Sequence, residues 1–398
     1  MLGGPHYMTD DGSHDKSWRS LWLSSGAMSA ALLGDALIYV VLPVNASAFG
    51  ISLAWVGVLL AANRIVRTFS YGMIAALGER IGFKSLCIFA SLTALASTAM
   101  YGLLQGWAPL LIARVLWGLS YGSLILATLG YAAADRTRTG TRVGVSRAVE
   151  QVGPLVALTG GAWLAGVVGP RDVFFYLALV SSIAVFLALF LPGKPTPSKA
   201  LSPDRPGIIP IPSRLDLLIF WMGFGVDGVF TMTLAIMFSG EMSIQVAMIW
   251  AGLVMSGRRV LEMIVAPFSG YIADRFGVQQ PLVAASLLLA LGLILVGFGF
   301  LQLGAIAIVL GRGALGTLIP SAVALFAVRA VLRPLARNLT WRDIGAAAGP
   351  LTTGFVLSFV KPEILHLILG TVFFVTLLWL IISPEWRESG KGQVMNRG

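Results

Sequence analysis

Long apolar segments separated by short polar breaks dominate the chain from Trp18 to Pro384. A stretch such as FFYLALVSSIAVFLALFLP, at residues 174–192, stays apolar without the alternation that a β-barrel strand requires. Because a helix needs roughly 20 apolar residues to cross a bilayer, the pattern predicts an all-α polytopic membrane protein. We expect twelve transmembrane helices, at residues 18–44, 51–77, 84–104, 108–134, 141–168, 172–192, 215–240, 244–273, 280–302, 304–332, 340–360 and 363–384.

One polar break is much longer than the others and divides the spans into two groups of six. It is GKPTPSKALSPDRPGIIPIPSR, rich in proline and serine as linkers often are. The first residues are polar and partly acidic, unlike the basic start of a signal peptide, so the first span is expected to remain in the protein. The expected organisation is a tail at residues 1–17, a six-helix bundle at 18–192, a linker at 193–214, a second six-helix bundle at 215–384 and a tail at 385–398.

Basic residues are distributed unevenly among the breaks. When both termini are placed in the cytoplasm, the outer loops hold only Arg171 and Lys361, and the other basic residues of loops and tails fall inside. Cytoplasmic loops of membrane proteins carry such an excess. We therefore expect a multi-pass protein of the inner (plasma) membrane with cytoplasmic termini and a cytoplasmic linker.

The composition excludes several other classes of protein. The chain is 57% hydrophobic and 12% charged, against about 25% charged residues in soluble domains. The net charge of +10 would indicate nucleic-acid binding in a soluble protein, but cytoplasmic loops account for it here, so we expect no nucleic-acid partner. Cys87 is the only cysteine, and the histidines His6, His14 and His366 lie far apart. We therefore expect no disulfide, no metal site and no cofactor.

The two groups of spans repeat the same markers in the same order. ALGERIGFK after the second span matches GYIADRFGV after the eighth. Such internal repeats are typical of transporters whose two bundles rock about a central site. The equivalent positions are Asp35 and Asp227, Arg64 and Arg259, Glu79 and Asp274, Arg114 and Arg312, and Gly153-Pro154 and Gly349-Pro350.

Three motifs connect the chain with a known family. GYIADRFG, at residues 270–277, resembles the signature loop G-x-x-x-D-R-x-G of the major facilitator superfamily, although the first-half copy has Ala75 and Glu79 in place of glycine and aspartate. RVLWGLSYG resembles the family's fourth-helix motif, and VGPLVALTGG resembles the fifth-helix motif of its drug/proton antiporter branch. The resemblance covers essentially Trp18 to Pro384 and implies the major facilitator fold, two pseudo-symmetric six-helix bundles, as a monomer.

The repeated loops and the glycine-proline pairs have mechanical interpretations. A helix can stop at the loop glycine, and the loop carboxylate can lie beside the start of the next helix; such a latch would hold one access state closed, whereas the alternative is a plain polar turn. Glycine-proline pairs break helical hydrogen bonds and can form a bend. The gating candidates are Glu79, Arg80, Gly82, Gly270, Asp274, Arg275 and Gly277, and the bend candidates are Gly153, Pro154, Gly349 and Pro350.

Ionisable side chains inside the apolar spans cost about 2.5–3.5 kcal/mol each to insert, so they need partners and usually serve function. Asp35 is either the structural partner of an arginine or a carboxylate that carries protons or binds substrate. Arg64 and Arg67 share a helix face and need an acid from another helix, for which Asp35 is the natural candidate, or an anionic ligand. Arg259 and Glu262 could neutralise each other. The proton-coupling and substrate candidates are Asp35, Arg64, Arg67, Arg114, Glu150, Asp227, Arg259, Glu262 and Arg312.

Two of these candidates carry further interpretations. Glu150 is either a solvated interfacial residue or, if it faces the cavity, a second proton carrier. The resemblance associates Arg114, the fourth-helix arginine, with proton coupling. Because arginines outnumber carboxylates within the spans, the sequence favours an anionic substrate without excluding a neutral or zwitterionic one.

These observations predict a secondary active transporter, a proton-coupled exporter of small organic molecules that works by alternating access. The chain has no G-x-x-x-x-G-K-[ST] loop for ATP. The main alternative is a proton-coupled uptake symporter for organic anions. A membrane enzyme should have a cluster of His, Asp or Cys in its loops, and this chain shows none in its sequence. A non-transporting sensor would be expected to lose the buried charges, and this chain keeps them.

Overall fold

The computed structural model describes residues 11–193, 209–239, 244–327, 331–384 and 386. Most of the predicted linker and of both predicted tails lies outside these residues. The described residues form twelve helical spans, two of which contain a short π-helical segment. The α-helices are long and apolar, and their loops are short, as the hydropathy pattern predicts.

Six spans make up the first bundle. A single 3-10 turn, η1 (Ala46–Phe49), lies between the first two spans. The fifth span runs continuously through α5, the π-helical segment η2 and α6. The elements are α1 (Asp11–Val44), α2 (Leu53–Ile81), α3 (Phe83–Leu103), α4 (Trp107–Ala132), α5 (Thr139–Val156), η2 (Ala157–Gly161), α6 (Ala162–Val168) and α7 (Val173–Leu189).

The second bundle repeats this arrangement with its first span interrupted. That span runs through α8, the π-helical segment η3 and α9. Such π-helical segments are rare and often mark functional sites. The elements are α8 (Arg214–Met222), η3 (Gly223–Phe230), α9 (Thr231–Ser239), α10 (Ile244–Phe276), α11 (Gln279–Gly297), α12 (Leu301–Phe326), α13 (Leu332–Val356) and α14 (Pro362–Ile382).

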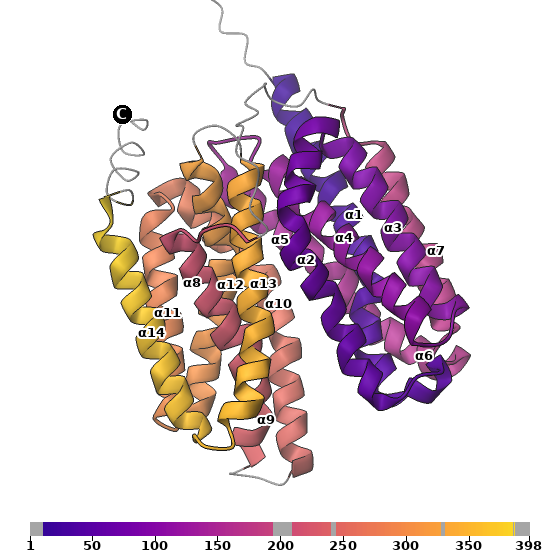
Figure 1. Cartoon of the computed structure of the whole chain (residues 1–398). Coiled ribbons are helices and arrows are strands. Elements are labelled where there is room, and N and C mark those ends of the chain that lie inside the picture. Colours follow the sequence, from indigo (N-terminus) through magenta and orange to yellow (C-terminus); the bar gives the residue numbers. More distant parts are fainter. Residues whose placement is uncertain (1–10, 194–208, 240–243, 328–330, 385, 387–398) are drawn as a thin grey trace, which may run out of the picture.

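The two bundles stand side by side, with the first in indigo to magenta and the second in red to yellow (Figure 1). They approach each other at the end where α1 begins and α14 ends, and they diverge toward the opposite end. We call the first of these ends the latch end. The two-bundle architecture predicted from the repeat is therefore confirmed.

By length and composition, eight helical stretches of the described residues could cross a membrane. The other four spans are α2, α7, α10 and α13; α7 is a shorter apolar helix of 17 residues. The remaining three carry charged residues that face the space between the bundles, such as Arg67, Glu262 and Asp343. Their lower apolar character therefore reflects the site that they build.

The turn before α13 differs from the prediction. Helix α12 ends at Phe326 and α13 begins at Leu332, whereas the expected spans ended at residue 332 and began again at 340. The arginines in the first turns of α13 resemble a loop in sequence but have partners in the folded chain. Arg333 Nε lies 3.2 Å from Glu79 Oε2, and Arg337 Nε lies 2.5 Å from Asp216 Oδ2.

Within each half, a glycine at an equivalent position lets two helices pack closely. A Cβ at Gly153 of α5 would overlap the carbonyl oxygen of Ser29 in α1. A Cβ at Gly349 of α13 would lie 2.5 Å from the carbonyl oxygen of Phe224 and 2.8 Å from the Cα of Gly228. The fifth span of each half therefore packs backbone to backbone against the first span, as small residues allow in membrane helices.

Candidate functional site

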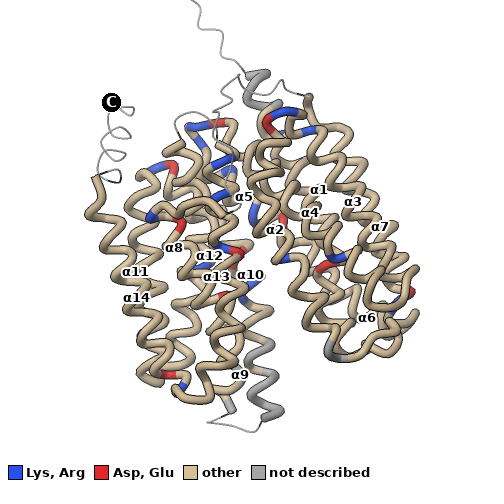
Figure 2. Tube along the Cα trace, in the orientation of Figure 1, with Lys and Arg blue, Asp and Glu red and all other residues tan. Residues whose placement is uncertain are grey.

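A cavity of about 520 Å³ lies between the two bundles. Its walls come from α1, α2, α4 and α5 of the first bundle and from α8 to α10, α12 and α13 of the second. Figure 2 shows charged residues near helix ends and at mid-height along the inner sides of the bundles. The predicted residues that line the cavity are Asp35, Arg64, Arg67, Glu150, Asp227, Arg259, Glu262 and Arg312.

Asp35 of α1 and Arg114 of α4 form an ion pair at the wall of the cavity. Asp35 Oδ1 lies 2.5 Å from Arg114 Nη1, and the side chain of Arg114 is 1% exposed. The guanidinium also donates hydrogen bonds to the Leu59 carbonyl oxygen at 3.0 Å and to the hydroxyls of Tyr39 at 3.0 Å and Tyr101 at 3.3 Å. Arg114 is thereby fixed in place, and Asp35 has this one ion-pair partner among the described residues.

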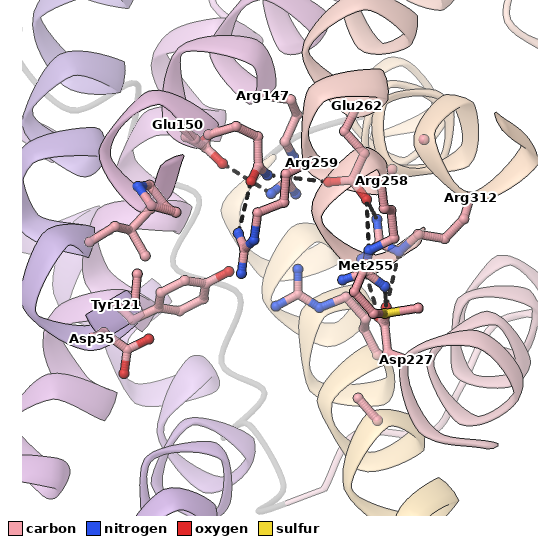
Figure 3. A pocket seen from close by; sticks show the side chains of 18 of the residues that line it. Asp35, Tyr121, Arg147, Glu150, Asp227, Met255, Arg258, Arg259, Glu262 and Arg312 are labelled. Carbon is pink, nitrogen blue, oxygen red and sulfur yellow. Dashed lines mark hydrogen bonds and ion pairs between the residues drawn. The ribbon is translucent and has the colours of Figure 1, made fainter. Parts of the chain in front are cut away.

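The equivalent pair in the second bundle carries more charge. Arg312 of α12 donates to both oxygens of Asp227, at 3.0 and 3.1 Å, and Arg258 Nη1 donates to Asp227 Oδ1 at 3.1 Å. Glu262 Oε1 lies 3.2 Å from Arg312 Nη1 and 3.7 Å from Arg258 Nε (Figure 3). Two guanidinium groups therefore balance two carboxylates. Glu262 pairs with Arg258 and Arg312 and not with Arg259, so the expected pairing of Arg259 with Glu262 is wrong.

Arg67 pairs across the two bundles, and the expected pairing of Arg67 with Asp35 is wrong. Arg67 Nε of α2 lies 2.8 Å from Asp343 Oδ2 of α13, because Asp35 is already held by Arg114. The Tyr71 hydroxyl, also on α2, donates to Asp343 Oδ2 at 3.0 Å. Arg342 Nη2 lies 3.0 Å from Asp343 Oδ1. Asp343 therefore receives contacts from both bundles.

Asp343 was not among the predicted site residues. The signal was present, since Arg342 and Asp343 are adjacent ionisable residues inside the predicted span 340–360. Asp216 was also missed inside the span 215–240; it accepts a hydrogen bond from Asn338 Nδ2 at 2.9 Å and pairs with Arg337. Both aspartates are ionisable residues within apolar spans, which is the signal that identifies them.

Two cavity arginines form no ion pair with the described residues. Arg64 of α2 donates from Nη1 to the carbonyl oxygen of Ala346 in α13 at 3.0 Å. Arg259 of α10 donates from Nη1 to Gln151 Oε1 of α5 at 3.1 Å, and it extends between the bundles toward Tyr121 (Figure 3). Each of these cations therefore bonds to a neutral oxygen of the opposite bundle.

Glu150 faces the cavity and is not a solvated interfacial residue. It is 3% exposed. Its carboxylate accepts hydrogen bonds from Ser146 Oγ at 3.2 Å and from Arg147 Nη1 at 3.1 Å, and Ser25 Oγ of α1 in turn donates to Ser146 at 2.9 Å. The location facing the cavity is confirmed, and the role of Glu150 as a second proton carrier stays a prediction.

The repeated loops lie at the latch end, where they join the bundles. Asp274 of α10 accepts hydrogen bonds from the backbone N–H groups of Gly140 and Thr141, both at 2.7 Å. The carboxylate therefore lies at the start of α5, in the opposite bundle, whereas the next helix in sequence was expected. A Cβ at Gly270 would overlap the carbonyl of Gly140, so glycine is required for this approach.

The first-half loop also contacts the opposite bundle, but through an ion pair between partly exposed side chains. Glu79 pairs with Arg333 in the first turn of α13, and the two side chains are 18% and 30% exposed. Gly82 and Gly277 both adopt positive φ, at 82° and 91°, which ends their helices as predicted. Arg80 is exposed, and Arg275 Nη1 donates to the hydroxyl of Tyr271 at 3.3 Å.

The glycine-proline positions lie inside helices close to the cavity. Pro154 lines the cavity, and the π-helical segment η2 begins three residues later, at Ala157. Gly153 N donates to Ser29 Oγ at 2.8 Å. In the second half, Pro350 lies in the last two turns of α13, which ends at Val356.

Comparisons with known proteins agree with this architecture. A family model described as Major Facilitator Superfamily matches residues 24–256. The multidrug resistance protein MdtG of Enterobacter lignolyticus is 26% identical over 355 residues, covering 84% of this chain and 83% of MdtG. MdtG of Escherichia coli (strain K12 / DH10B) is 26% identical over 357 residues, covering 84% and 85%.

Solved structures share the fold at lower identity. The human organic anion transporter MFSD10 (TETRAN) superposes with a TM-score of 0.71 at 16% identity, over 91% of this chain and 99% of that protein. The Escherichia coli fucose:proton symporter FucP superposes with a TM-score of 0.67 at 15% identity, over 90% and 98%. Because the family model matches more than half of the chain and the structure has the two-bundle fold, the chain belongs to the major facilitator superfamily and is a multi-pass membrane transporter.

Proposed function

We propose that this protein is a proton-coupled exporter of small organic molecules. One observation carries the proposal: a cavity between two bundles that is lined by half-buried and buried carboxylates, each held by arginines. A carboxylate that gains a proton releases its guanidinium partner, so protonation can change the contacts that hold one access state. The antiporter-like motif VGPLVALTGG and the likeness to MdtG favour export over uptake.

The contacts at the latch end define the access state of this structure. Asp274 at the start of α5, Glu79 with Arg333, and Arg136 Nη2 with the Ala327 carbonyl oxygen at 2.8 Å all join the bundles there. The bundles diverge at the other end (Figure 1). If both termini lie in the cytoplasm, the joined latch end is the cytoplasmic end, and these contacts favour an outward-facing state.

Asp35 is the proposed proton carrier. It is 14% exposed and has one guanidinium partner, whereas Asp227 receives three hydrogen bonds from two arginines. Adding a proton to Asp35 therefore disrupts fewer charged contacts. Glu150 is the proposed second carrier, because it also lines the cavity and is held by one arginine, Arg147.

The proposed substrate is anionic, and the proposed functional unit is a monomer. Guanidinium groups outnumber carboxylates around the cavity, and such an excess in a site shielded from water favours anionic groups. The unit can be a monomer because the cavity is built within one chain. Proton-coupled uptake of organic anions is the alternative. It would use the same carboxylates, with the substrate moving inward.

Proteoliposomes with a pH-sensitive dye inside test the proposal. Anionic, neutral and cationic compounds are added against an imposed proton gradient, to wild type, Asp35→Asn and the control Asp172→Asn, an exposed aspartate before α7. Export predicts proton movement opposite to the compound, lost in Asp35→Asn and kept in the control. Proton movement in the same direction as the compound would establish uptake instead.

A further inference from the structure

We propose that Arg64 and Arg259 form a clamp for a carboxylate-bearing substrate, with one arginine from each bundle. The inference rests on the proposed transport function and names the residues that recognise the substrate. It starts from the distribution of ion pairs around the cavity, where a buried cation ordinarily has an acidic partner.

Most cavity arginines have an acidic partner. Arg67 and Arg342 contact Asp343, Arg147 contacts Glu150, and Arg258 and Arg312 share Asp227 and Glu262. Among the described residues, Arg64 and Arg259 form no ion pair, and both line the cavity. These two guanidinium groups are the natural sites for an external anion.

The two arginines are equivalent positions of the internal repeat, and both cross the interface between the bundles. Arg64 of the first bundle donates to Ala346 O of the second, and Arg259 of the second donates to Gln151 of the first. The acceptors are neutral, a carbonyl and an amide. A carboxylate accepts charge-assisted hydrogen bonds that are roughly twice as strong, so a substrate can displace these acceptors without leaving a buried anion unpaired.

Gln151 can release Arg259 and still keep a hydrogen-bond partner. Its Oε1 accepts from Arg259, while its Nε2 donates to Glu262 Oε2 at 3.3 Å. When a substrate carboxylate replaces Gln151 at Arg259, the amide still has Glu262 as a partner. Tyr121, toward which Arg259 extends (Figure 3), also lines the cavity, and its ring already carries the Arg67 guanidinium, 4.2 Å from the ring centroid.

Because the clamp spans both bundles, binding is coupled to their relative position. A substrate held by Arg64 and Arg259 together experiences a different separation of the two groups in each access state. Compounds with a carboxylate are therefore expected to be transported, and the same compounds as neutral amides are expected to bind weakly.

Benzoate and its neutral isostere benzamide test the clamp. The shift in thermal unfolding midpoint and the heat of binding are measured for the purified full chain in detergent. We expect benzoate to stabilise wild type and benzamide not to do so. Arg64→Gln and Arg259→Gln should each weaken benzoate binding roughly tenfold to hundredfold, the usual effect of losing a hydrogen bond to a charged group.

Controls separate binding from folding. Arg19→Gln removes the same charge from an exposed position outside the cavity and should bind benzoate like wild type. If a glutamine variant does not fold, Arg64→Lys or Arg259→Lys keeps the charge without the planar fork and should bind with intermediate affinity. Equal responses to benzoate and benzamide, no benzoate response in wild type, or unchanged affinity in both glutamine variants would overturn the clamp.

The transport assay distinguishes failure of the clamp from failure of the proposed function. If both glutamine variants still export a neutral or cationic compound with proton coupling and wild type ignores benzoate, the exporter stands and the clamp is wrong. If no compound moves protons in wild type, the exporter is wrong, and selective benzoate binding through Arg64 and Arg259 would still support the clamp as the site of an anion exchanger.

Discussion

Arg67 of α2 and Asp343 of α13 lie 2.8 Å apart and join the two bundles through a nearly buried ion pair. Their side chains are 8% and 3% exposed. Because α2 and α13 belong to different bundles, the pair must break or rearrange when the bundles separate at the latch end. The strength of this pair therefore contributes to the balance between access states.

We predict that Asp343→Asn shifts the protein toward the state that is open at the latch end. The variant leaves Arg67 without its acid, and breaking a buried pair in this way costs about 3–5 kcal/mol. Spin labels on Arg138→Cys and Gln280→Cys, both exposed near the latch, would report the change as a longer distance. The natural Cys87 is buried. An unchanged distance distribution would show that the pair does not hold the bundles together.

The close contact between α5 and α1 gives a second prediction. A Cβ at Gly153 overlaps the carbonyl oxygen of Ser29, so Gly153→Ala must displace one helix. Overpacking of this kind costs about 1–3 kcal/mol, and we expect a lower thermal unfolding midpoint and slower transport. Gly160→Ala is the matched control, because an added Cβ there meets nothing within 4 Å. Similar losses in both variants would contradict the packing argument.

The internal repeat accounts for how much of the site could be predicted from the sequence. Asp35 and Arg114 match Asp227 and Arg312 in position, and both pairs form contacts in the structure. The repeat predicts which positions are equivalent but not their partners, since Asp35 was expected to pair with Arg64 or Arg67 and pairs with Arg114. The pair of Arg67 with Asp343 lies between the bundles, and spacing within one half cannot show which residues face each other across the interface.

Helix boundaries show a similar limit. The start of α13 was placed eight residues too late, because Arg333 and Arg337 look like loop residues until their partners Glu79 and Asp216 are known. Hydropathy reports the apolar length of a helix and cannot report an ion pair with a distant segment. The errors therefore concentrate on charged residues that bind another helix.

Arg114→Lys provides a third prediction. Arg114 uses its planar fork for Asp35, for the Leu59 carbonyl oxygen and for two tyrosine hydroxyls. A lysine keeps the charge but cannot make these bonds together. We expect proton-coupled transport to fall roughly tenfold or more, measured in proteoliposomes.

Arg171→Lys is the control for that substitution. Arg171 Nη2 donates one hydrogen bond, to the Gly102 carbonyl oxygen at 2.7 Å, which a lysine can replace. It should transport like wild type. Full activity of Arg114→Lys would show that charge alone suffices at this position.

The two loops of the latch should differ in strength, although they are equivalent in the repeat. Asp274 accepts two backbone hydrogen bonds at the start of α5, whereas Glu79 pairs with a partly exposed Arg333.

Asp274→Asn keeps one acceptor oxygen and places an amide N–H against the second backbone N–H. It therefore loses a charge-assisted bond worth about 1.5–3 kcal/mol, while a partly exposed pair such as Glu79–Arg333 contributes about 1 kcal/mol or less. We expect the spin-label pair on Arg138→Cys and Gln280→Cys to show a longer distance in Asp274→Asn and little change in Glu79→Gln. An equal or larger change in Glu79→Gln would mean that the latch depends on the ion pair of the first half and not on the helix start that Asp274 caps.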